Sequence, residues 1–400
     1  MSGKVRILML ASVASMIDQF NMSNIRLLLE MGYEVHVACN FKKGNTCDTN
    51  RIRRLRKMLD NMQVVQHQWD CPRSILGPGQ CLRAYYQLWR LTGQYRFFRI
   101  HCHSPVGSVL ARVAAHGRGI KVIYTAHGFH FYKGAPLRNR MLYYPVEKLL
   151  SAWTDVLITV NREDYCLAKR KLHAGKVYRI PGVGIDVGRF QKHAVQEITT
   201  DFRAAYEIPA DALVLLSVGE LSRRKNHQAV ILALAELQRQ DVYYVICGQG
   251  KQKYRLWNIA QKYGVAHLVR MTGFLEKVSS AYDCADIFVF PSLQEGLPVA
   301  LMEAMAAGLP CVVSDIRGNR ELICEKGGRR FSPTGCKSTE QLLQYLKELL
   351  DNRDIREACG HYNRKKIKAY DVTVVERHMK RIYKKTIGND QSAAHRNRKV

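Results

Sequence analysis

The chain of 400 residues carries 62 Lys and Arg against 34 Asp and Glu, a formal net charge of +28, and 47% of its residues are hydrophobic. This length predicts about two globular domains, and the apolar fraction is sufficient for two cores. The 12 cysteines form no CxxC pair and no Cys/His cluster at zinc-ligand spacing, which favours reduced core thiols over a disulfide framework or a structural metal.

The first elements predict a unit of strand, helix and parallel strand. Lys4 and Arg6 precede an apolar run that ends in small residues and resembles the start of a secretory signal, but "VRILML" followed by "NIRLLLEMGYEVHVAC" supplies a strand, a helix, a stop at Gly32 and a second strand. A first strand is therefore the better interpretation. No run reaches the roughly 20 apolar residues of a membrane-spanning helix, so we expect a soluble or peripheral protein.

A dense basic run follows at residues 51–62, "RIRRLRKMLDNM". Helical spacing places Ile52, Leu55 and Leu59 on one side and a cationic face on the other. Such a face, which includes Arg53, Arg54 and Lys57, suits an anionic bilayer surface, and a merely solvated basic face is the alternative. Nucleic acid is not expected as a partner, because no zinc finger, RRM signature or aromatic-interleaved basic stripe is present.

Apolar runs then alternate with helical segments along the whole chain. Further strands are predicted at "FRIHCH", "KVIYTAH" and "DVLITV", and after a linker-like stretch near residues 185–200 at "LVLLSVG", "YYVICGQG", "LVRMTGF", "DIFVFPS" and "PCVVSD". This rhythm predicts two α/β domains with doubly wound parallel sheets. Open sheets of this kind bind ligands at the carboxyl ends of their strands, and we expect the two domains to face a central cleft.

The second half contains a predicted anion site. In "SVGELSRRKNHQAV" a strand ends at Gly219, and Arg223, Arg224 and Lys225 stand near the start of the next helix. Exposed amides and a helix dipole would add to these cations. Gly248 and Gly250 after the next strand would allow backbone to approach a flat or phosphorylated ligand, although each glycine alone is more often a simple turn.

Two carboxylates stand out in "QEGLPVALMEAMAAGLPCVVSD", where Glu295 precedes a helix expected to start at Pro298 and Glu303 lies in that otherwise apolar helix. A carboxylate in such surroundings needs hydrogen-bond donors, and the hydroxyls of a sugar or ribose are well suited. A capping acid at Glu295 and an exposed polar residue at Glu303 are the structural alternatives.

Together, the E-x7-E pair, "SVGELSRRKNH", "VICGQG" and "GFLEKVSSAYDCADIFVFPS" resemble the donor-nucleotide domain of family 4 glycosyltransferases, which have the GT-B fold. In the first half, "HCHSPVGSVLAR", "YTAHGFHFYKGAP", "LYYPVEKLL" and "IPGVGID" resemble the branch that builds bacterial capsular and exopolysaccharide repeat units. The resemblance covers the chain up to about Tyr370.

The resemblance implies specific roles for the donor-side residues. Glu303 would bind the nucleotide ribose and Glu295 the donor sugar, while Lys225 would bind phosphate. Amides of Gly296 and Leu297 would lie near the diphosphate. Relatives often carry an arginine where this chain has Glu220, so Arg223 or Arg224 is expected to replace it. The donor-binding set is Lys225, Arg224, Arg223, Gly219, Gly248, Gly296, Leu297 and Glu303.

The resemblance also implies an active-site histidine in the first domain, at His127 in "TAHG", with His103 as a second candidate on the acceptor side. The predicted catalytic residues are thus His127 and Glu295. No DxD-like acidic pair follows a strand, which agrees with the family's metal-independent stabilisation of the leaving group; neither a metal nor another cofactor is expected. Retention of the anomeric configuration follows from the resemblance alone.

The function expected is transfer of a hexose or N-acetylhexosamine from a nucleotide sugar, most simply UDP-linked, to a polyprenyl-diphosphate-linked saccharide in capsule or exopolysaccharide synthesis. The enzyme would be cytoplasmic and peripheral on the inner face of the membrane, where an anionic surface would attract Arg53, Arg54 and Lys57. A GT-B relative acting on a free nucleotide sugar, such as an epimerase, and a non-catalytic nucleotide-sugar or polyanion-binding protein are the alternatives. The expected domains are residues 1–188 for the acceptor and 189–370 for the donor, with a helix at about 371–388 packing back on the first and a disordered basic tail at 389–400.

Overall fold

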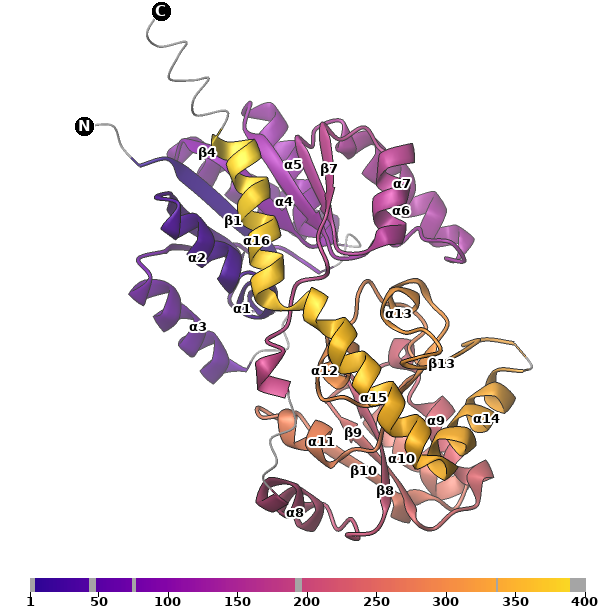
Figure 1. Ribbon diagram of the computed structural model, residues 1–400. Helices are drawn as coiled ribbons and strands as arrows, with labels where there is room; N and C mark the ends of the chain where they lie inside the picture. The colour runs from indigo at the N-terminus through magenta and orange to yellow at the C-terminus, as the bar shows by residue number, and fades with distance from the viewer. Residues whose placement is uncertain (1–3, 43–47, 74–76, 191–195, 336, 389–400) are drawn as a thin grey trace, which may run out of the picture. The chain divides into compact units, whose positions relative to one another are not determined.

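The computed structural model describes residues 4–42, 48–73, 77–190, 196–335 and 337–388 (Figure 1). The chain forms two compact units, the first made of residues 1–183 and 373–400 and the second of residues 184–372. The sequence placed the corresponding boundaries at 188/189 and 370/371. The tail expected at 389–400 lies outside the described residues.

The first unit is built on a seven-stranded sheet of order β3-β2-β1-β4-β5-β6-β7, in which every neighbouring pair is parallel. The order reverses between β1 and β4, as in a doubly wound sheet. The strands are β1 (Arg6–Val13), β2 (Glu34–Asn40), β3 (Val65–Gln68), β4 (Phe97–His103), β5 (Lys121–Ala126), β6 (Val156–Thr159) and β7 (Lys176–Arg179).

Helices connect these strands. The central strands are apolar enough to be buried on both faces of the sheet, and β1 is fully buried from Ile7 to Ser12. The helices are α1 (Ala14–Phe20), α2 (Met22–Glu30), α3 (Thr49–Asn61), α4 (Pro78–Gln94), α5 (Pro105–Gly117), α6 (Leu137–Ser151), α7 (Arg162–Lys171) and, after the second unit, α16 (Val372–Tyr383) with a π-helical turn at Lys384–Gly388.

The second unit repeats the pattern in a six-stranded parallel sheet of order β10-β9-β8-β11-β12-β13. Its strands are β8 (Leu213–Val218), β9 (Val242–Cys247), β10 (Val269–Gly273), β11 (Ile287–Phe290), β12 (Cys311–Ser314) and β13 (Gly328–Phe331). Its helices are α8 (Gln196–Ala205), α9 (Gln228–Leu237), α10 (Lys253–Lys262), α11 (Ser279–Cys284), α12 (Val299–Ala306), α13 (Arg317–Leu322), α14 (Ser338–Asp351) and α15 (Arg353–Ile367). Short 3-10 turns lie at Gly188–Phe190, Arg223–Lys225, Ala266–Leu268 and Lys368–Tyr370.

The strands predicted from the sequence are all present, and the sequence missed β3, β7 and β13. Each of these is a short edge strand, with sequences "VQHQ", "KVYR" and "GRRF". An edge strand needs little apolar surface, so its sequence carries almost no periodic signal. Among the described residues, no helix is both long and apolar enough to cross a membrane.

Candidate functional site

The second unit brings two strand ends together where its strand order reverses. β8 pairs directly with β11, so the loops that follow these two strands are neighbours. The loop after β8 carries Arg224 and Lys225, and the loop after β11 carries Glu295. Lys225 Nζ lies 2.9 Å and Arg224 Nη1 2.8 Å from the same oxygen, Glu295 Oε1. Two positions far apart in the sequence thus form one charged cluster at the carboxyl end of the sheet.

Backbone contacts fix this cluster. The amide of Leu293 donates to the carbonyl of Arg224 at 2.8 Å, and Arg224 Nη1 donates to the carbonyl of Gln294 at 2.8 Å. Arg317 Nε donates to the carbonyl of Glu295 at 3.0 Å. Lys225 Nζ also lies 4.5 Å from the centre of the Phe290 ring, a favourable cation–π distance. The two loops are therefore held in position before any ligand enters.

The carboxylate of Glu295 is ionised in this setting. Burial raises its pKa, but the charges of Lys225 and then Arg224 outweigh this, and the net pKa lies below the usual value. Its side chain is only 10% exposed, and that of Lys225 is 11% exposed. Two cations against one carboxylate leave one positive charge in excess, which suits an anionic ligand.

The helix after this loop begins one residue later than the sequence predicted. Pro298 is the N-cap of α12, not its first helical residue, and Gly308, with φ +76°, follows its end. Gly296 is partly exposed and Leu297 is buried. The loop packs closely on α13, because a Cβ at Gly318 would lie 2.4 Å from the carbonyl oxygen of Gly296.

Gly219 and Gly248 serve loop packing in the structure. A Cβ at Gly248 would lie 1.9 Å from the carbonyl oxygen of Gly219, and one at Gly250 would lie 2.4 Å from that of Leu221. The side-chain positions of Gly248 and Gly250 therefore face the loop after β8. These glycines let the loops after β8 and β9 approach each other, which places the cations at the end of β8.

Arg223 and Arg224 separate in the structure although they are adjacent in sequence. Arg224 contacts Glu295, whereas Arg223 lines a pocket of about 390 Å³ together with Ser222, Arg255 and Leu293. The geometry therefore favours Arg224 as the arginine of the charged cluster.

Glu303 lies on α12, just over one turn after its first residue, Val299. Its Oε2 accepts a hydrogen bond from the hydroxyl of Tyr282 at 2.9 Å, and the same hydroxyl contacts the carbonyl of Ala300 at 3.0 Å. Burial raises the pKa of Glu303 to about 7, while the hydrogen bond from Tyr282 and the charge of Arg189 lower it. A carboxylate with one donor in so buried a place would be stabilised by further hydroxyl donors.

Glu303→Gln should therefore stabilise the protein at high pH. The carboxyl keeps its proton in the folded state up to about pH 7, against a usual pKa of 4.5. The contribution of the protonated carboxyl to folding stability is therefore complete below pH 4.5 and is lost as the pH rises to 7. At about 1.4 kcal/mol per pKa unit, the glutamine variant should be more stable than wild type by roughly 3 kcal/mol at pH 8 and by less than about 1 kcal/mol at pH 5.

Urea unfolding at both pH values measures this difference. The matched control is Glu236→Gln at an exposed position of α9, which should change stability by less than about 0.5 kcal/mol at either pH. An equal gain for Glu303→Gln at pH 5 and pH 8 would contradict the prediction, because it would not arise from titration.

The first unit has a histidine cluster at the carboxyl ends of β4 and β5. His127 follows β5 and is partly exposed. Its Nε2 lies 3.1 Å from Nδ1 of His103, which is only 1% exposed, and Nε2 of His103 lies 3.2 Å from Sδ of Met9. His103, the second candidate predicted on the acceptor side, is therefore buried and contacts His127 and Met9.

The chemistry of these neighbours assigns the protons. A thioether sulfur can only accept, so Nε2 of His103 carries the hydrogen and its Nδ1 accepts from Nε2 of His127. This leaves Nδ1 of His127 as a hydrogen-bond acceptor. Burial lowers the pKa of His127 to about 4 and that of His103 well below its usual value, so both rings are neutral near pH 7.

The basic helix of the sequence analysis is α3. Leu55 and Leu59 are buried and Ile52 is partly buried, while Arg53, Arg54 and Lys57 are exposed. The predicted division into an apolar inner side and a cationic outer side is confirmed.

Sequence reasoning missed several residues that complete these groups. Tyr282 binds Glu303, Arg317 binds the Glu295 carbonyl, and His101 lies below His103, bonded to Tyr383 and Thr125 at 2.8 Å each. His101 had a sequence signal, because polar residues alternate in "FRIHCH" within a strand that is buried along most of its length. Nothing in the sequence indicated the partners of Tyr282 or Arg317, which come from other elements.

Comparison with protein families gives two matches that together cover most of the chain. Residues 22–189 match the model described as Glycosyltransferase Family 4, and residues 198–366 match that described as Glycosyl transferases group 1. A Bacillus subtilis (strain 168) protein named as the glycosyltransferase EpsD is 37% identical over 80% of this chain and 81% of its own length. The Escherichia coli UDP-Gal:alpha-D-GlcNAc-diphosphoundecaprenol alpha-1,3-galactosyltransferase is 27% identical over 60% of this chain and 64% of its own length.

Solved structures resemble the whole chain in fold. Alr3699/HepE of Anabaena, in complex with UDP-glucose, matches with a TM-score of 0.76 and 15% identity over 95% of this chain and 99% of its own. WaaG, described as a glycosyltransferase involved in lipopolysaccharide biosynthesis, matches with a TM-score of 0.71 and 18% identity over 94% of this chain and 99% of its own.

Proposed function

Because the chain belongs to the family 4 glycosyltransferases of polysaccharide biosynthesis, with the GT-B fold, we propose a specific transfer for it. The donor is a UDP-linked hexose or N-acetylhexosamine, and the acceptor is a polyprenyl-diphosphate-linked saccharide. The observation that carries the donor assignment is the cluster of Lys225, Arg224 and Glu295, with Glu303 on the helix that follows. The name of the E. coli relative, which uses UDP-galactose and a diphosphoundecaprenol acceptor, supports both choices.

In this proposal, each residue of the candidate site in the second unit has a role in binding the donor. Glu303, which has one donor in Tyr282, accepts hydrogen bonds from the ribose hydroxyls. Glu295 binds hydroxyls of the donor sugar. Lys225 and Arg224 contact both Glu295 and the diphosphate, and their positive charges neutralise the diphosphate. The amides of Gly296 and Leu297 lie toward the diphosphate.

The chemical step places negative charge where these cations stand. The bond between the anomeric carbon and the diphosphate oxygen breaks, and its electron pair stays on the diphosphate. The acceptor hydroxyl forms the new bond on the same face of the sugar, and its proton passes to the departing phosphate oxygen, so the configuration is retained. Lys225 and Arg224 favour this step because their attraction strengthens as the charge develops.

His127 is the contribution of the first unit to catalysis in this proposal. Its ring is neutral near pH 7 because burial lowers its pKa to about 4. It therefore contacts a hydroxyl of the transferred sugar through the Nδ1 lone pair and carries no positive charge of its own. Membrane attachment on the cytoplasmic face would bring the enzyme to a lipid-linked acceptor, and the exposed cations of α3 would attract anionic lipid.

Thermal stability with UDP, GDP and ADP tests the donor assignment. A ligand at about 100 times its dissociation constant adds about 2.7 kcal/mol of stability. UDP should stabilise wild type more than GDP or ADP do, and Glu303→Ala should lose that response while Glu236→Ala keeps it. A preference for GDP would redirect the donor to another nucleotide sugar, and the absence of any response would remove the donor-site assignment. Conversion of a free UDP-sugar without an acceptor would favour an epimerase instead.

Arg224→Ala should reduce kcat/KM more than Arg223→Ala does. Arg224 contacts Glu295 within the charged cluster, whereas Arg223 lines the neighbouring pocket. Loss of a hydrogen-bonded cation costs roughly 1.5–3 kcal/mol, so we expect a decrease of about tenfold or more for Arg224→Ala and about threefold or less for Arg223→Ala. Steady-state kinetics with varied donor measures both, and the reverse ranking would transfer the phosphate role to Arg223.

Chelation of divalent metal ions should leave the transfer rate unchanged in this proposal. Side-chain cations supply the positive charge at the leaving diphosphate, so EDTA in excess should alter the initial rate by less than about twofold. A loss of activity that Mg²⁺ or Mn²⁺ restores would show that a metal ion shares this task.

A further inference from the structure

Helix α6 (Leu137–Ser151) of the first unit exposes an unusually apolar side. Leu137 is 71% exposed, Met141 69% and Leu149 63%. At 3.6 residues per turn, the exposed apolar positions cover about half of the helix circumference. They are Leu137, Met141, Leu142, Pro145, Val146 and Leu149. Single exposed apolar residues are common, but so many on one helix indicate an interaction surface.

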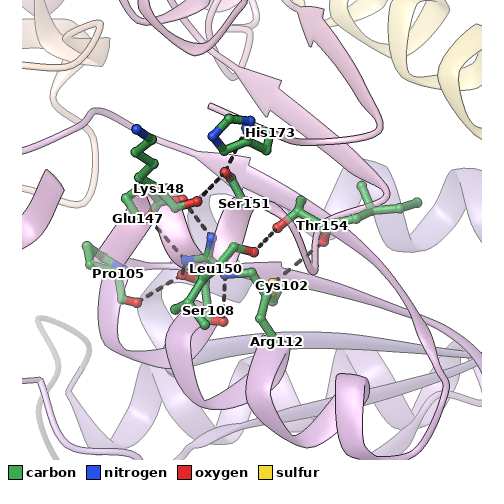
Figure 2. Close-up of polar contacts among 11 residues, drawn as sticks. Cys102, Pro105, Ser108, Arg112, Glu147, Lys148, Leu150, Ser151, Thr154 and His173 are labelled. Atoms are coloured by element: carbon green, nitrogen blue, oxygen red, sulfur yellow. Dashed lines mark hydrogen bonds and ion pairs between the residues drawn. The ribbon is translucent and has the colours of Figure 1, made fainter. Parts of the chain in front are cut away.

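The opposite side of α6 is fixed to the core, so the exposed side cannot turn inward. Glu147 forms two hydrogen bonds to Arg112 of α5, at 2.6 and 3.1 Å. Arg112 is fully buried and lies over the Tyr124 ring at 4.5 Å. At the end of the helix, the hydroxyl of Ser151 accepts from the amide of His173 at 2.8 Å. Figure 2 shows the contact of Glu147 with Arg112 and that of Ser151 with His173.

The charges on α6 indicate what the exposed side contacts. Arg138, Arg140 and Lys148 are exposed, and the single carboxylate of the helix, Glu147, is buried against Arg112. Arg138 and Lys148 fall within the apolar half of the circumference, where their long aliphatic stems can lie along an apolar surface while the charged ends reach water. An apolar strip interspersed with cations complements the interface of an anionic bilayer better than it complements a dry protein surface.

We propose that α6 lies in the plane of an anionic bilayer, with its apolar side among the acyl chains below the headgroups. With 15 residues, the helix is too short to span the membrane. This inference rests on the proposed function, because a lipid-linked acceptor gives the enzyme a reason to bind the membrane. Its test needs neither donor nor acceptor. It also differs from the electrostatic attraction expected of α3, whose leucines are buried and which offers mainly charge.

Salt distinguishes the two modes of attachment. At 1 M salt, charges are screened over about 3 Å, so attraction by α3 alone should be lost. Apolar insertion by α6 persists at that concentration. Flotation of the whole protein with phosphatidylcholine vesicles that contain phosphatidylglycerol as the anionic lipid, in low salt and in 1 M salt, separates these contributions.

Wild type should remain on these vesicles in 1 M salt, and Met141→Ser/Leu149→Ser should lower the vesicle-bound to free ratio by roughly tenfold or more, because two apolar side chains no longer enter the acyl region. Both residues are highly exposed in the free protein, so the fold should persist. The matched control is Tyr254→Ser/Tyr263→Ser, two exposed aromatic positions of the second unit, which should float as wild type does. Arg53→Gln/Arg54→Gln should weaken retention in low salt only.

Retention of Met141→Ser/Leu149→Ser at the wild-type level in 1 M salt would overturn the proposal, as would release of wild type under that condition. Light scattering provides another decisive outcome: a wild-type dimer that this variant dissociates would identify the surface as a contact between two copies of the chain. The response to UDP separates this proposal from the proposed function. A variant that leaves the vesicles but keeps its UDP response supports the role of α6, and a wild type without a UDP response leaves the vesicle result standing.

Discussion

Lys225→Ala should lower kcat by about 10²–10³-fold with little change in KM, the loss typical of removing one donor that stabilises developing negative charge. Lys225 is only 11% exposed and lies 2.9 Å from Glu295 Oε1, so its charge acts in a poorly hydrated place where it is weakly screened. Its attraction for the diphosphate should grow as the sugar departs. The expected effect therefore falls on the chemical step.

Glu295 keeps Arg224 as a partner in this variant, which limits the structural damage. Initial rates at saturating and limiting donor concentration give kcat and KM separately. Lys262→Ala, at an exposed position of α10, is the control for loss of one positive charge and should react as wild type. A Lys225→Ala enzyme with unchanged kcat would remove this lysine from the catalytic step.

Glu147→Leu should destabilise the first unit by about 3–5 kcal/mol, because it leaves the guanidinium of Arg112 buried without its carboxylate. The double variant Arg112→Leu/Glu147→Leu should recover most of this loss, since two apolar side chains in contact need no counter-charge. The contrast between the single and double variants distinguishes an unpaired buried charge from a general packing defect.

Urea unfolding followed by tryptophan fluorescence suits this test, because Trp69, Trp89 and Trp153 all lie in the first unit. The exposed pair of Arg353 and Glu357 provides the comparison: Arg353→Leu should leave the urea midpoint almost unchanged. Equal losses for Glu147→Leu and for the double variant would contradict the assigned cause.

The sequence predicted the central strands of both sheets because their apolar runs are long and are separated by helical periods. It predicted the helix after Glu295 from its proline and glycine, with an error of one residue at Pro298. The last helix, expected at about 371–388, is α16 with the turn that follows it. Local patterns were sufficient for these elements because each depends on its own residues.

The contacts within the candidate site required the order of the strands. Lys225 meets Glu295 because β8 lies beside β11 and not beside β10, and local periodicity does not determine that order. Likewise, the partner of Glu303 is Tyr282 of α11, which a single sequence cannot indicate. Pattern and resemblance could identify the charged residues separately, whereas their pairing depends on the tertiary fold.

The return of the chain to the first unit affects the order in which the protein can mature on the ribosome. On β4, His101 forms a hydrogen bond with the hydroxyl of Tyr383, and Arg99 donates one to the carbonyl of Thr386. Both partners lie some 280 residues later in the chain. A nascent chain that has reached residue 372 contains the whole second unit, whereas the core of the first still lacks these partners. The second unit can therefore mature during translation, while the first must wait for one of the last helices to be synthesised before its buried histidine and arginine are satisfied.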